Sequence, residues 1–355
     1  MSCGGTGGHI VPALAIADTI RENNAKSRIL FVGSEQGLEK ELVPKAGYEL
    51  MTLRVRGLSR SLSPANLRVL WQMGRAVARA EEILAEFCPD IVIGTGGYAC
   101  YPTLRAAVKA GIPTAVHESN AIPGLAVKRL AGKVDRVWLN FAAAGEGISS
   151  KASICVVGNP LRRQATEKQS KQTGDTLRVL SFGGSLGADS LNRAVLDLMC
   201  EEQRMGGVEH LHATGKKHFD EVKQAFCALS LDRDPRFSLV PFIDNMPYHM
   251  AAADLVICRA GAMSISELAM LAKAAILIPS PNVTGNHQYK NAKMLVDRQA
   301  ATMVCEDHLS DLVPTALSLL GSAAARERLS HNILKLAVPD ANRRILTEIR
   351  ELLRK

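Results

Sequence analysis

The sequence predicts an α/β protein made of two similar halves, each built on a parallel sheet. Strand-like and helix-like stretches alternate along almost the entire chain, as is typical of parallel α/β layers. A glycine-rich loop opens the chain at Gly4–His9, and a second follows far downstream at Gly183–Ala188. Glycine lets the backbone turn tightly and brings its N–H groups close to a ligand at the start of a helix. The paired loops favour two nucleotide-type folds that face one cleft.

The first half alternates short apolar runs with helical patterns. Strand-like runs lie at 28–33, 90–94, 113–117, 135–140 and 154–158, and helix-like runs at 12–23, 37–45, 64–87 and 102–110. Pro12 and Pro64 suit the first turn of a helix. A loop such as Gly4–His9 normally follows a strand, but only three residues precede it. We therefore expect the first strand to be truncated.

A polar, aperiodic stretch at 162–176 predicts a linker between the halves. The second half repeats the alternation, with strand-like runs at 177–182, 208–213, 237–242, 255–258, 275–279 and 301–305 and helix-like runs at 188–202, 218–229, 264–273, 287–299 and 323–337. The expected domains are 1–160 and 161–339. The last helix, at about 340–355, is expected to pack back on the first domain.

Composition narrows the function classes. Aromatic residues make up only 4% of the chain, which argues against stacking platforms for single-stranded nucleic acid, so no nucleic-acid partner is expected. The eight cysteines are scattered without a CxxC pair and indicate the reduced thiols of a cytosolic protein. Without an apolar run of roughly 18 residues, any membrane contact is expected to be peripheral.

Residues 52–80 carry six arginines and no acid, with apolar side chains between them. Such a mixture favours contact with an anionic membrane surface. The alternative is a helix with a solvated basic face and core leucines. The residues proposed for the membrane contact are Arg54, Arg56, Arg60, Leu62, Leu67, Arg68, Leu70, Trp71 and Arg75.

Two motifs in the second half contain polar groups suited to a nucleotide sugar. In Cys258–Glu267 a strand ends and a helix is expected near Ser264, so Ser264 and Glu267 form either a capping box or a site for a diphosphate and a ribose diol. In Gly285–Asn291 the side chains of His287, Gln288 and Asn291 share one helical face. They suit sugar hydroxyls, or they are an exposed polar helix start.

Two further motifs end strands of the first half, where open α/β sheets bind ligands. Gly94–Tyr98 is a glycine-rich turn. His117 and Glu118 are adjacent and suit an acid/base pair, followed by Asn120. Because a zinc site needs further ligands at suitable spacing, no metal is expected.

The order of seven motifs resembles one family, the lipid II-forming N-acetylglucosaminyltransferases of bacterial cell-wall synthesis. The motifs are GGTGGH, GTGGY, HESN, NPLR, GGSLGA, CRAGAMS with its following Glu, and HQYKNA. The resemblance implies a GT-B fold, in which two Rossmann-like domains face a deep cleft, with acceptor and membrane contacts in domain 1–160 and the donor in 161–339. It implies inverting transfer of N-acetylglucosamine from UDP-N-acetylglucosamine to the C4 hydroxyl of the muramyl sugar of lipid I, with no metal or cofactor.

The resemblance also implies roles for single residues. His9 is the expected general base, with His117 and Glu118 as rivals. Glu267 is expected on the ribose, Ile243 on uracil with Arg162 beside the base, and Asn120 reaching the sugar from the first domain. The remaining substrate-binding residues are Thr6, Gly7, Gly8, Ser185, Met263, Ser264, His287, Gln288 and Asn291 for the donor, and Gly96, Gly97 and Tyr98 for the acceptor.

The same resemblance implies a peripheral protein on the cytoplasmic face of the plasma membrane, with other cell-wall synthesis proteins as candidate partners. Two other function classes stay open. One is a non-hydrolysing UDP-sugar 2-epimerase of similar architecture. The other is a catalytically inactive, membrane-docked protein that binds UDP. A nicotinamide-dependent dehydrogenase is disfavoured because the G-x-G-x-x-G fingerprint and its acidic residue are missing.

Overall fold

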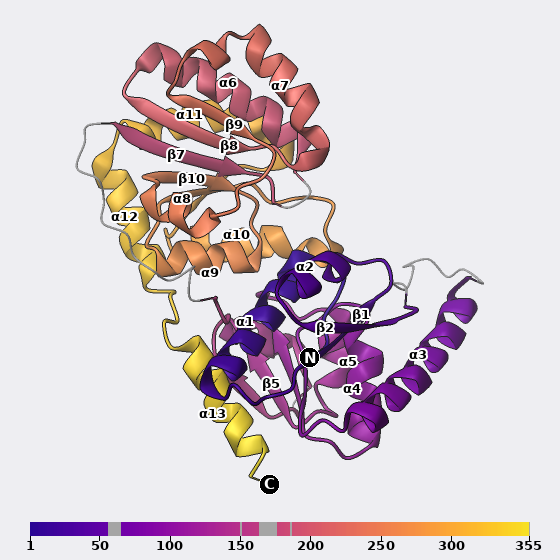
Figure 1. The fold of residues 1–355 in the computed structure, drawn as a ribbon. Helices are drawn as coiled ribbons and strands as arrows, with labels where there is room; N and C mark the ends of the chain where they lie inside the picture. The colour runs from indigo at the N-terminus through magenta and orange to yellow at the C-terminus, as the bar shows by residue number, and fades with distance from the viewer. Residues whose placement is uncertain (56–64, 150, 163–175, 185–186, 355) are drawn as a thin grey trace. The chain divides into compact units, whose positions relative to one another are not determined.

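The structure is a computed structural model that describes residues 1–55, 65–149, 151–162, 176–184 and 187–354. The chain forms two compact units (Figure 1). Unit 1 contains residues Met1–Arg162 and Val338–Lys355, and unit 2 contains Arg163–Ala337. The polar stretch expected as a linker lies almost wholly outside the described residues.

Unit 1 is built on parallel strands. They are β1 (Leu30–Ser34), β2 (Glu49–Leu53), β3 (Val92–Gly94), β4 (Thr114–Glu118), β5 (Arg136–Leu139) and β6 (Ile154–Val156). The two-stranded group β1–β2 and the four-stranded group β3–β4–β5–β6 are joined by Ser2. Ser2 forms parallel bridges to Val32 of β1 and to Gly94 of β3. The strand β2 was absent from the sequence prediction because its residues are only partly buried and show no clean apolar run.

The first strand is as short as the sequence predicted, and its three residues bond to both neighbouring strands. The N–H of Val32 donates to Met1 O at 2.8 Å and the N–H of Cys3 donates to Val32 O at 3.2 Å. On the other side, Ser2 N–H donates to Ile93 O at 2.7 Å and Thr95 N–H donates to Ser2 O at 3.0 Å. A very short segment therefore occupies the place of the first strand and satisfies both neighbours.

Helices cover both faces of the unit 1 sheet. They are α1 (Gly7–Asn23), α2 (Glu39–Lys45), α3 (Ala65–Phe87), α4 (Cys100–Lys109), α5 (Leu125–Leu130), the 3₁₀ helix η1 (Ala142–Gly147) and α13 (Ala341–Leu352). Alternate strand residues enter opposite cores: Val137 and Leu139 of β5 pack among residues of α3, α4 and α5, whereas Trp138 packs with Ile345 of α13. The last helix thus completes one face of this unit.

The first helix begins earlier than its sequence pattern predicted. It starts at Gly7, so Gly7, Gly8 and His9 belong to its first turn, and Pro12 lies inside the helix rather than in the first turn. Proline lacks the N–H that a helix interior uses and was therefore read as a helix start. Thr6 stands at the N-cap, but its side chain makes no capping hydrogen bond, and the first turn contains no acidic residue.

Unit 2 has a six-stranded sheet in the order β12-β11-β10-β7-β8-β9, and each described strand pair is parallel. The strands are β7 (Leu177–Phe182), β8 (Val208–Ala213), β9 (Phe237–Val240), β10 (Leu255–Cys258), β11 (Ala275–Leu277) and β12 (Thr302–Met303). The helices are α6 (Asp189–Met205), α7 (Phe219–Ala228), α8 (Met246–Ala252), α9 (Ala262–Met270), α10 (His287–Val296), α11 (Leu312–Leu320) and α12 (Ala323–Leu334). Figure 1 shows α6, α7 and α11 over one face of this sheet.

Both sheets share one strand order. If the strands of each unit are numbered along the chain, with the Ser2 segment as the first of unit 1, they lie across the sheet in the order third, second, first, fourth, fifth and sixth. In unit 1 the order reverses between Ser2 and β3, and in unit 2 it reverses between β7 and β10. Ligands of open α/β sheets bind at such a switch point, beyond the carboxyl ends of the strands. The order therefore brings Gly4–His9 together with the turn after β3, and the described residues 183–184 and 187–188 together with the turn after β10.

Candidate active site

The first switch point, formed by residues 4–9 and 95–98, is a close contact between two glycine turns. Gly96 and Gly97 have φ of +100° and +87°, where L side chains are strained. A Cβ on Gly96 would lie 2.6 Å from His9 Cδ2, and one on Gly97 would collide with the backbone of Gly4. The Thr95 hydroxyl donates to His9 O at 2.6 Å. These glycines are needed for the approach of the two turns, and exposed Tyr98 follows them.

His9 lies in the first turn of α1, directly at this contact. Its Nδ1 is 3.2 Å from Gly4 O and 3.4 Å from the Thr6 hydroxyl. Because a carbonyl oxygen only accepts, Nδ1 carries the proton in the neutral ring, and Nε2 is the nitrogen that can take up a proton. The N–H groups of Gly7 and Gly8, at the start of a 17-residue helix, lack helical carbonyl partners. The arrangement suits an anion beside a proton acceptor.

A buried carboxylate that sequence analysis missed supports this loop. Glu39 is fully buried, its Oε2 accepts from Gly5 N–H at 2.9 Å, and its Oε1 accepts from the N–H and hydroxyl of Ser34 at 2.7 and 2.6 Å. Burial raises the pKa of Glu39, but the bonds from Ser34 and Gly5 outweigh it and lower the pKa overall. An acid in a charged helical run carries no sequence signal of burial.

His117 and Glu118 end β4, yet neither is open to solvent. His117 is fully buried, and its Nε2 lies 3.0 Å from Gly158 O. Burial lowers the pKa of His117 to about 4, so the ring is neutral at pH 7. The oxygens of Glu118 accept from Asn120 N–H and side-chain Nδ2 at 2.9 and 3.1 Å, and from Gly124 N–H at 2.7 Å. These contacts hold the loop that carries Asn120.

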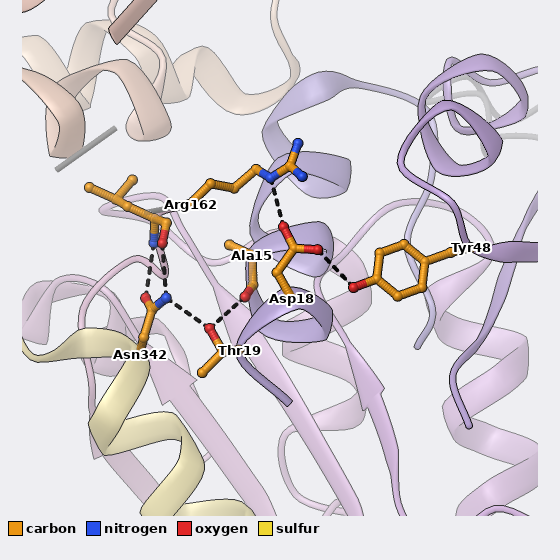
Figure 2. A network of polar contacts seen from close by, with 7 residues as sticks. Ala15, Asp18, Thr19, Tyr48, Arg162 and Asn342 are labelled. Atoms are coloured by element: carbon orange, nitrogen blue, oxygen red, sulfur yellow. Dashed lines mark hydrogen bonds and ion pairs between the residues drawn. The ribbon is translucent and has the colours of Figure 1, made fainter. Parts of the chain in front are cut away.

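Arg162 is tied to unit 1 through α1, as Figure 2 shows. Its Nε donates to Asp18 at 2.7 Å, and the same carboxylate accepts from Tyr48 OH at 2.7 Å. Beside it, Asn342 bonds both the N–H and the carbonyl of Leu161, at 3.1 and 2.9 Å, and donates to Thr19. The guanidinium is half exposed. The chain at 161–162 is thereby pinned to α1 and α13.

The second switch point consists of the described residues 183–184 and 187–188 after β7 and residues 259–264 after β10. Gly187 has φ of +74°, and a Cβ there would collide with the carbonyl of Thr214. The proposed diphosphate residue Ser185 lies outside the described residues. Helices α6 and α9 both begin at this edge, so their first-turn N–H groups point to the place expected for an anion.

The start of α9 differs from the expected one. Its N-cap is Gly261, with no side-chain cap, so Ser264 is the third helical residue and Glu267 the sixth. The capping-box alternative is therefore wrong, because Ser264 does not stand at the cap position. Met263 is buried and Ser264 and Glu267 are partly exposed. Burial raises the pKa of Glu267 to about 7.

The amide side chains of α10 hold the neighbouring loops. Asn291 is fully buried and its Nδ2 donates to Ala260 O at 3.2 Å. Gln288 Oε1 accepts from Ser280 N–H at 2.9 Å. His287, the first residue of α10, is partly exposed. Beyond β9, Ile243 is buried beside exposed Phe242.

An ion pair that sequence analysis missed joins Arg259 of the second switch point to three segments beside it. Arg259, 11% exposed, pairs with Glu306, 23% exposed, and donates to Ile278 O and Pro279 O at 3.3 and 3.4 Å. Glu306 also accepts from the hydroxyl of Ser190 on α6. Burial raises the pKa of Glu306, but Arg259 and Ser190 outweigh it and lower the pKa. Because Arg259 and Glu306 lie 47 positions apart in sequence, no local sequence pattern indicates that they form a pair.

Only part of the expected membrane patch can be located. Trp71 on α3 is 62% exposed, with the guanidinium carbon of Arg75 4.9 Å from its ring centroid. Arg54 forms an exposed ion pair with Glu35. Arg56, Arg60 and Leu62, and the side chains of Leu67, Arg68 and Leu70, lie outside the described residues. Among the helices of the described ranges, none has the length and apolarity to cross a membrane.

Comparison with known proteins matches both units. Residues 1–139 match the glycosyltransferase family 28 N-terminal domain, and residues 178–345 match its C-terminal domain. A UDP-N-acetylglucosamine--N-acetylmuramyl-(pentapeptide) pyrophosphoryl-undecaprenol N-acetylglucosamine transferase of Limosilactobacillus fermentum is 37% identical over 361 residues, which cover 99% of this chain and 97% of the relative. A relative of the same name from Acetivibrio thermocellus is 37% identical over 363 residues, covering 100% and 98%.

Solved structures agree on the fold, which is GT-B. The crystal structure of Acinetobacter baumannii MurG aligns with a TM-score of 0.79 at 24% identity, over 99% of this chain and 98% of that one. A UDP-GlcNAc 2-epimerase from Neisseria meningitidis aligns with a TM-score of 0.66 at 11% identity, over 98% of each chain. The chain belongs to the family of UDP-N-acetylglucosamine--N-acetylmuramyl-(pentapeptide) pyrophosphoryl-undecaprenol N-acetylglucosamine transferases.

Proposed function

We propose that this protein transfers N-acetylglucosamine from UDP-N-acetylglucosamine to the C4 hydroxyl of the N-acetylmuramyl sugar in lipid I. The product is lipid II, a precursor of peptidoglycan, and the anomeric centre inverts. The observation that carries the proposal is the similarity to transferases of this name along the whole length of both chains. The enzyme is a metal-independent hexosyltransferase.

The second switch point is the proposed donor half-site. The first turns of α6 and α9, with Ser185, Met263 and Ser264, receive the diphosphate, and their N–H groups stabilise the charge that develops on departing UDP. Glu267 accepts hydrogen bonds from the ribose hydroxyls, and Ile243 meets uracil. His287 and Gln288 face the sugar, whereas buried Asn291 positions the loop at Ala260. Arg162 and Asn120 are the proposed contributions of unit 1.

The first switch point is the proposed acceptor half-site. Thr6, Gly7 and Gly8, which the sequence analysis gave to the donor, bind a substrate phosphate at the start of α1, and Gly96–Tyr98 border the muramyl sugar. As the C4 oxygen forms its bond to C1 of N-acetylglucosamine, His9 Nε2 takes the hydroxyl proton. The C1–O bond to the diphosphate breaks on the opposite face, and UDP leaves with the electron pair. His117 and Glu118 act as positioning residues.

The test is transfer of radiolabelled N-acetylglucosamine from its UDP donor to a soluble lipid I analogue. Label is expected in a β-1,4-linked disaccharide product, and only when the acceptor is present. Loss of donor without acceptor, with release of the 2-epimer, would instead indicate the epimerase. Binding of UDP with no turnover at high enzyme concentration would indicate an inactive binding protein.

The substitution Glu267→Ala is expected to raise KM for the donor about tenfold or more, with a smaller change in kcat, because two hydrogen bonds to a charged acceptor are lost.

Since the ionised carboxylate accepts both bonds and the pKa of Glu267 is about 7, the wild-type donor KM should rise as the pH falls from 8 to 6. Initial rates at both pH values measure this. Ser266→Ala on the same helix is the control. An unchanged donor KM in Glu267→Ala would overturn the ribose assignment.

We further propose that residues 52–80 bind the anionic cytoplasmic face of the plasma membrane. Exposed Trp71 beside Arg75 supports this role. Co-sedimentation with vesicles containing anionic lipid should fall as salt rises, and it should weaken further in Arg75→Gln. Arg193→Gln, at an exposed arginine of unit 2, is the control. Equal binding to neutral and anionic vesicles would show that electrostatic attraction does not contribute to the proposed membrane contact.

A further inference from the structure

We propose that Glu39 is a positioning residue that sets the tautomer and proton affinity of His9 through the single peptide group that joins Gly4 to Gly5. This inference rests on the proposed role of His9 as general base. Glu39 lies at the start of α2 and has no direct contact with the imidazole among the described hydrogen bonds. The connection runs through a backbone amide that both side chains use.

The geometry is a three-part relay. The carbonyl oxygen of Gly4 lies 3.2 Å from His9 Nδ1, and the N–H of Gly5 donates to Glu39 Oε2 at 2.9 Å. The carbonyl of Gly4 and the N–H of Gly5 belong to the same planar amide. A carboxylate on the N–H side increases the negative charge on the oxygen side, because hydrogen-bonded groups polarise one another. The Nδ1–H bond is thereby strengthened, and Nε2 becomes a better proton acceptor.

The carboxylate sits in a space built for it. Its other oxygen is fixed by the N–H and the hydroxyl of Ser34, at 2.7 and 2.6 Å. A Cβ on Gly4 or Gly33 would lie 2.7 or 2.6 Å from Glu39 side-chain atoms, and one on Gly37 would collide with its carboxylate. Three glycines thus make room for one buried acid, which the opening glycine loop alone does not require.

The relay also determines which amides remain for substrate. Gly5 N–H is used by Glu39. Any phosphate at the first switch point is therefore met by amides further along the loop, at the start of α1. The Glu39 carboxylate places a fixed negative charge behind the loop. The loop therefore has two separate tasks: its first-turn amides bind an anion, and its Gly4–Gly5 amide orients the base.

Other titratable groups around the loop do not compete with Glu39 for this effect. Burial raises the pKa values of the Cys3 and Cys100 thiols to about 12, so both are neutral at pH 7. Burial lowers the pKa of the Met1 amine to about 6. Glu118 is coupled electrostatically to Cys100, and its oxygens accept from Asn120 and Gly124. In contrast, the net lowering of the Glu39 pKa keeps its carboxylate ionised.

A purely structural role for Glu39, which would join β1 and α2 to the loop, makes a different prediction. It would affect stability without changing the ring of His9 in the folded protein. The substitution Glu39→Gln separates the two roles. Glutamine has one acceptor oxygen, and if that oxygen serves Ser34, its NH2 group faces Gly5 N–H and cannot accept from it. The relay is broken while the size of the side chain is kept.

The direct test is a ¹⁵N NMR titration of His9 in the full-length protein, assigned with His9→Gln. Neutral wild-type His9 is expected to carry its proton on Nδ1. In Glu39→Gln the ring should become a mixture of tautomers, and the pKa of His9 should fall by about half a pH unit or more. Asp135→Asn, which loses a carboxylate bonded to Thr114 at the other end of the sheet, should leave both unchanged.

Activity gives a second readout. In Glu39→Gln the acid limb of the kcat/KM profile should move to lower pH by the same amount, and kcat should fall about threefold or more with a donor KM within twofold of wild type. A wild-type tautomer and pKa of His9 in folded Glu39→Gln would overturn the relay. So would an Nε2–H tautomer in the wild type, which tests the relay even if the variant does not fold. If the tautomer and pKa of His9 change in Glu39→Gln while the His9→Gln variant keeps full kcat, the relay would stand and the role of His9 as general base would be rejected.

Discussion

His9→Ala is expected to lower kcat for transfer to the lipid I analogue by about 10²–10⁴-fold, the usual contribution of a general base. Its ring lies at the contact of the two glycine turns, with Nδ1 directed to Gly4 O and Nε2 as the proposed proton acceptor. The acceptor hydroxyl of a sugar is a poor nucleophile until its proton is removed. The loss should therefore appear in kcat, with a small change in the donor KM.

The comparison variants separate chemistry from folding. His331→Ala, at an exposed position on α12 of unit 2, should leave the rate unchanged. His117→Asn should lower stability, because a buried ring bonded to Gly158 O is replaced, and its rate per folded molecule should stay well above that of His9→Ala. If folded His9→Ala kept more than about a tenth of the wild-type kcat, His9 would not be the base.

Glu306→Ala is expected to cost about 3 kcal/mol of unfolding free energy, because it leaves the largely buried guanidinium of Arg259 without its carboxylate. Replacing both residues, as in Arg259→Met with Glu306→Leu, should recover much of that loss, since neither charge then remains buried. Urea unfolding followed by circular dichroism measures both. The donor KM should also rise in the single variant, because Arg259 holds the segment that leads into α9.

The exposed pair of Lys293 and Asp297 on α10 is the matched control. Asp297→Ala should cost at most about 0.5 kcal/mol, as is usual for an exposed helical pair. The pKa of Glu306 is lowered, so its contribution is present above the ordinary carboxyl pKa and is lost as the pH falls below it. Equal losses in Glu306→Ala and Asp297→Ala would contradict the stabilising role given to the pair of Arg259 and Glu306.

Much of the architecture follows from local pattern, and the comparisons confirm the predicted fold class, family and activity. Apolar runs such as Leu255–Cys258 coincide with observed strands, because strands buried on both faces of a parallel sheet are continuously apolar. Helix starts were less certain. The N-caps of α1 and α9 are Thr6 and Gly261, and neither makes a side-chain capping hydrogen bond that would mark the start at Gly7 or Ala262.

The missed residues share one cause. Glu39 and the pair of Arg259 with Glu306 act by bonding to backbone and side chains that the topology brings together, such as Gly5 with Ser34 and Ile278 with Ser190. Their local sequence resembles ordinary surface charge. The placements of Arg162 beside Asp18 and of Asn291 beneath Ala260 likewise depend on contacts between distant segments. The substrate roles of these residues remain predictions.

The central claim is that helix-start amides and the protein's own side chains support the departure of UDP and the attack of the sugar hydroxyl without a divalent cation. The most direct measurement is the initial rate of N-acetylglucosamine transfer to the lipid I analogue in EDTA, before and after addition of Mg²⁺ or Mn²⁺. We predict the same rate in EDTA as in untreated enzyme, with no gain from either cation. Loss of transfer in EDTA and its recovery on addition of the cation would contradict the claim.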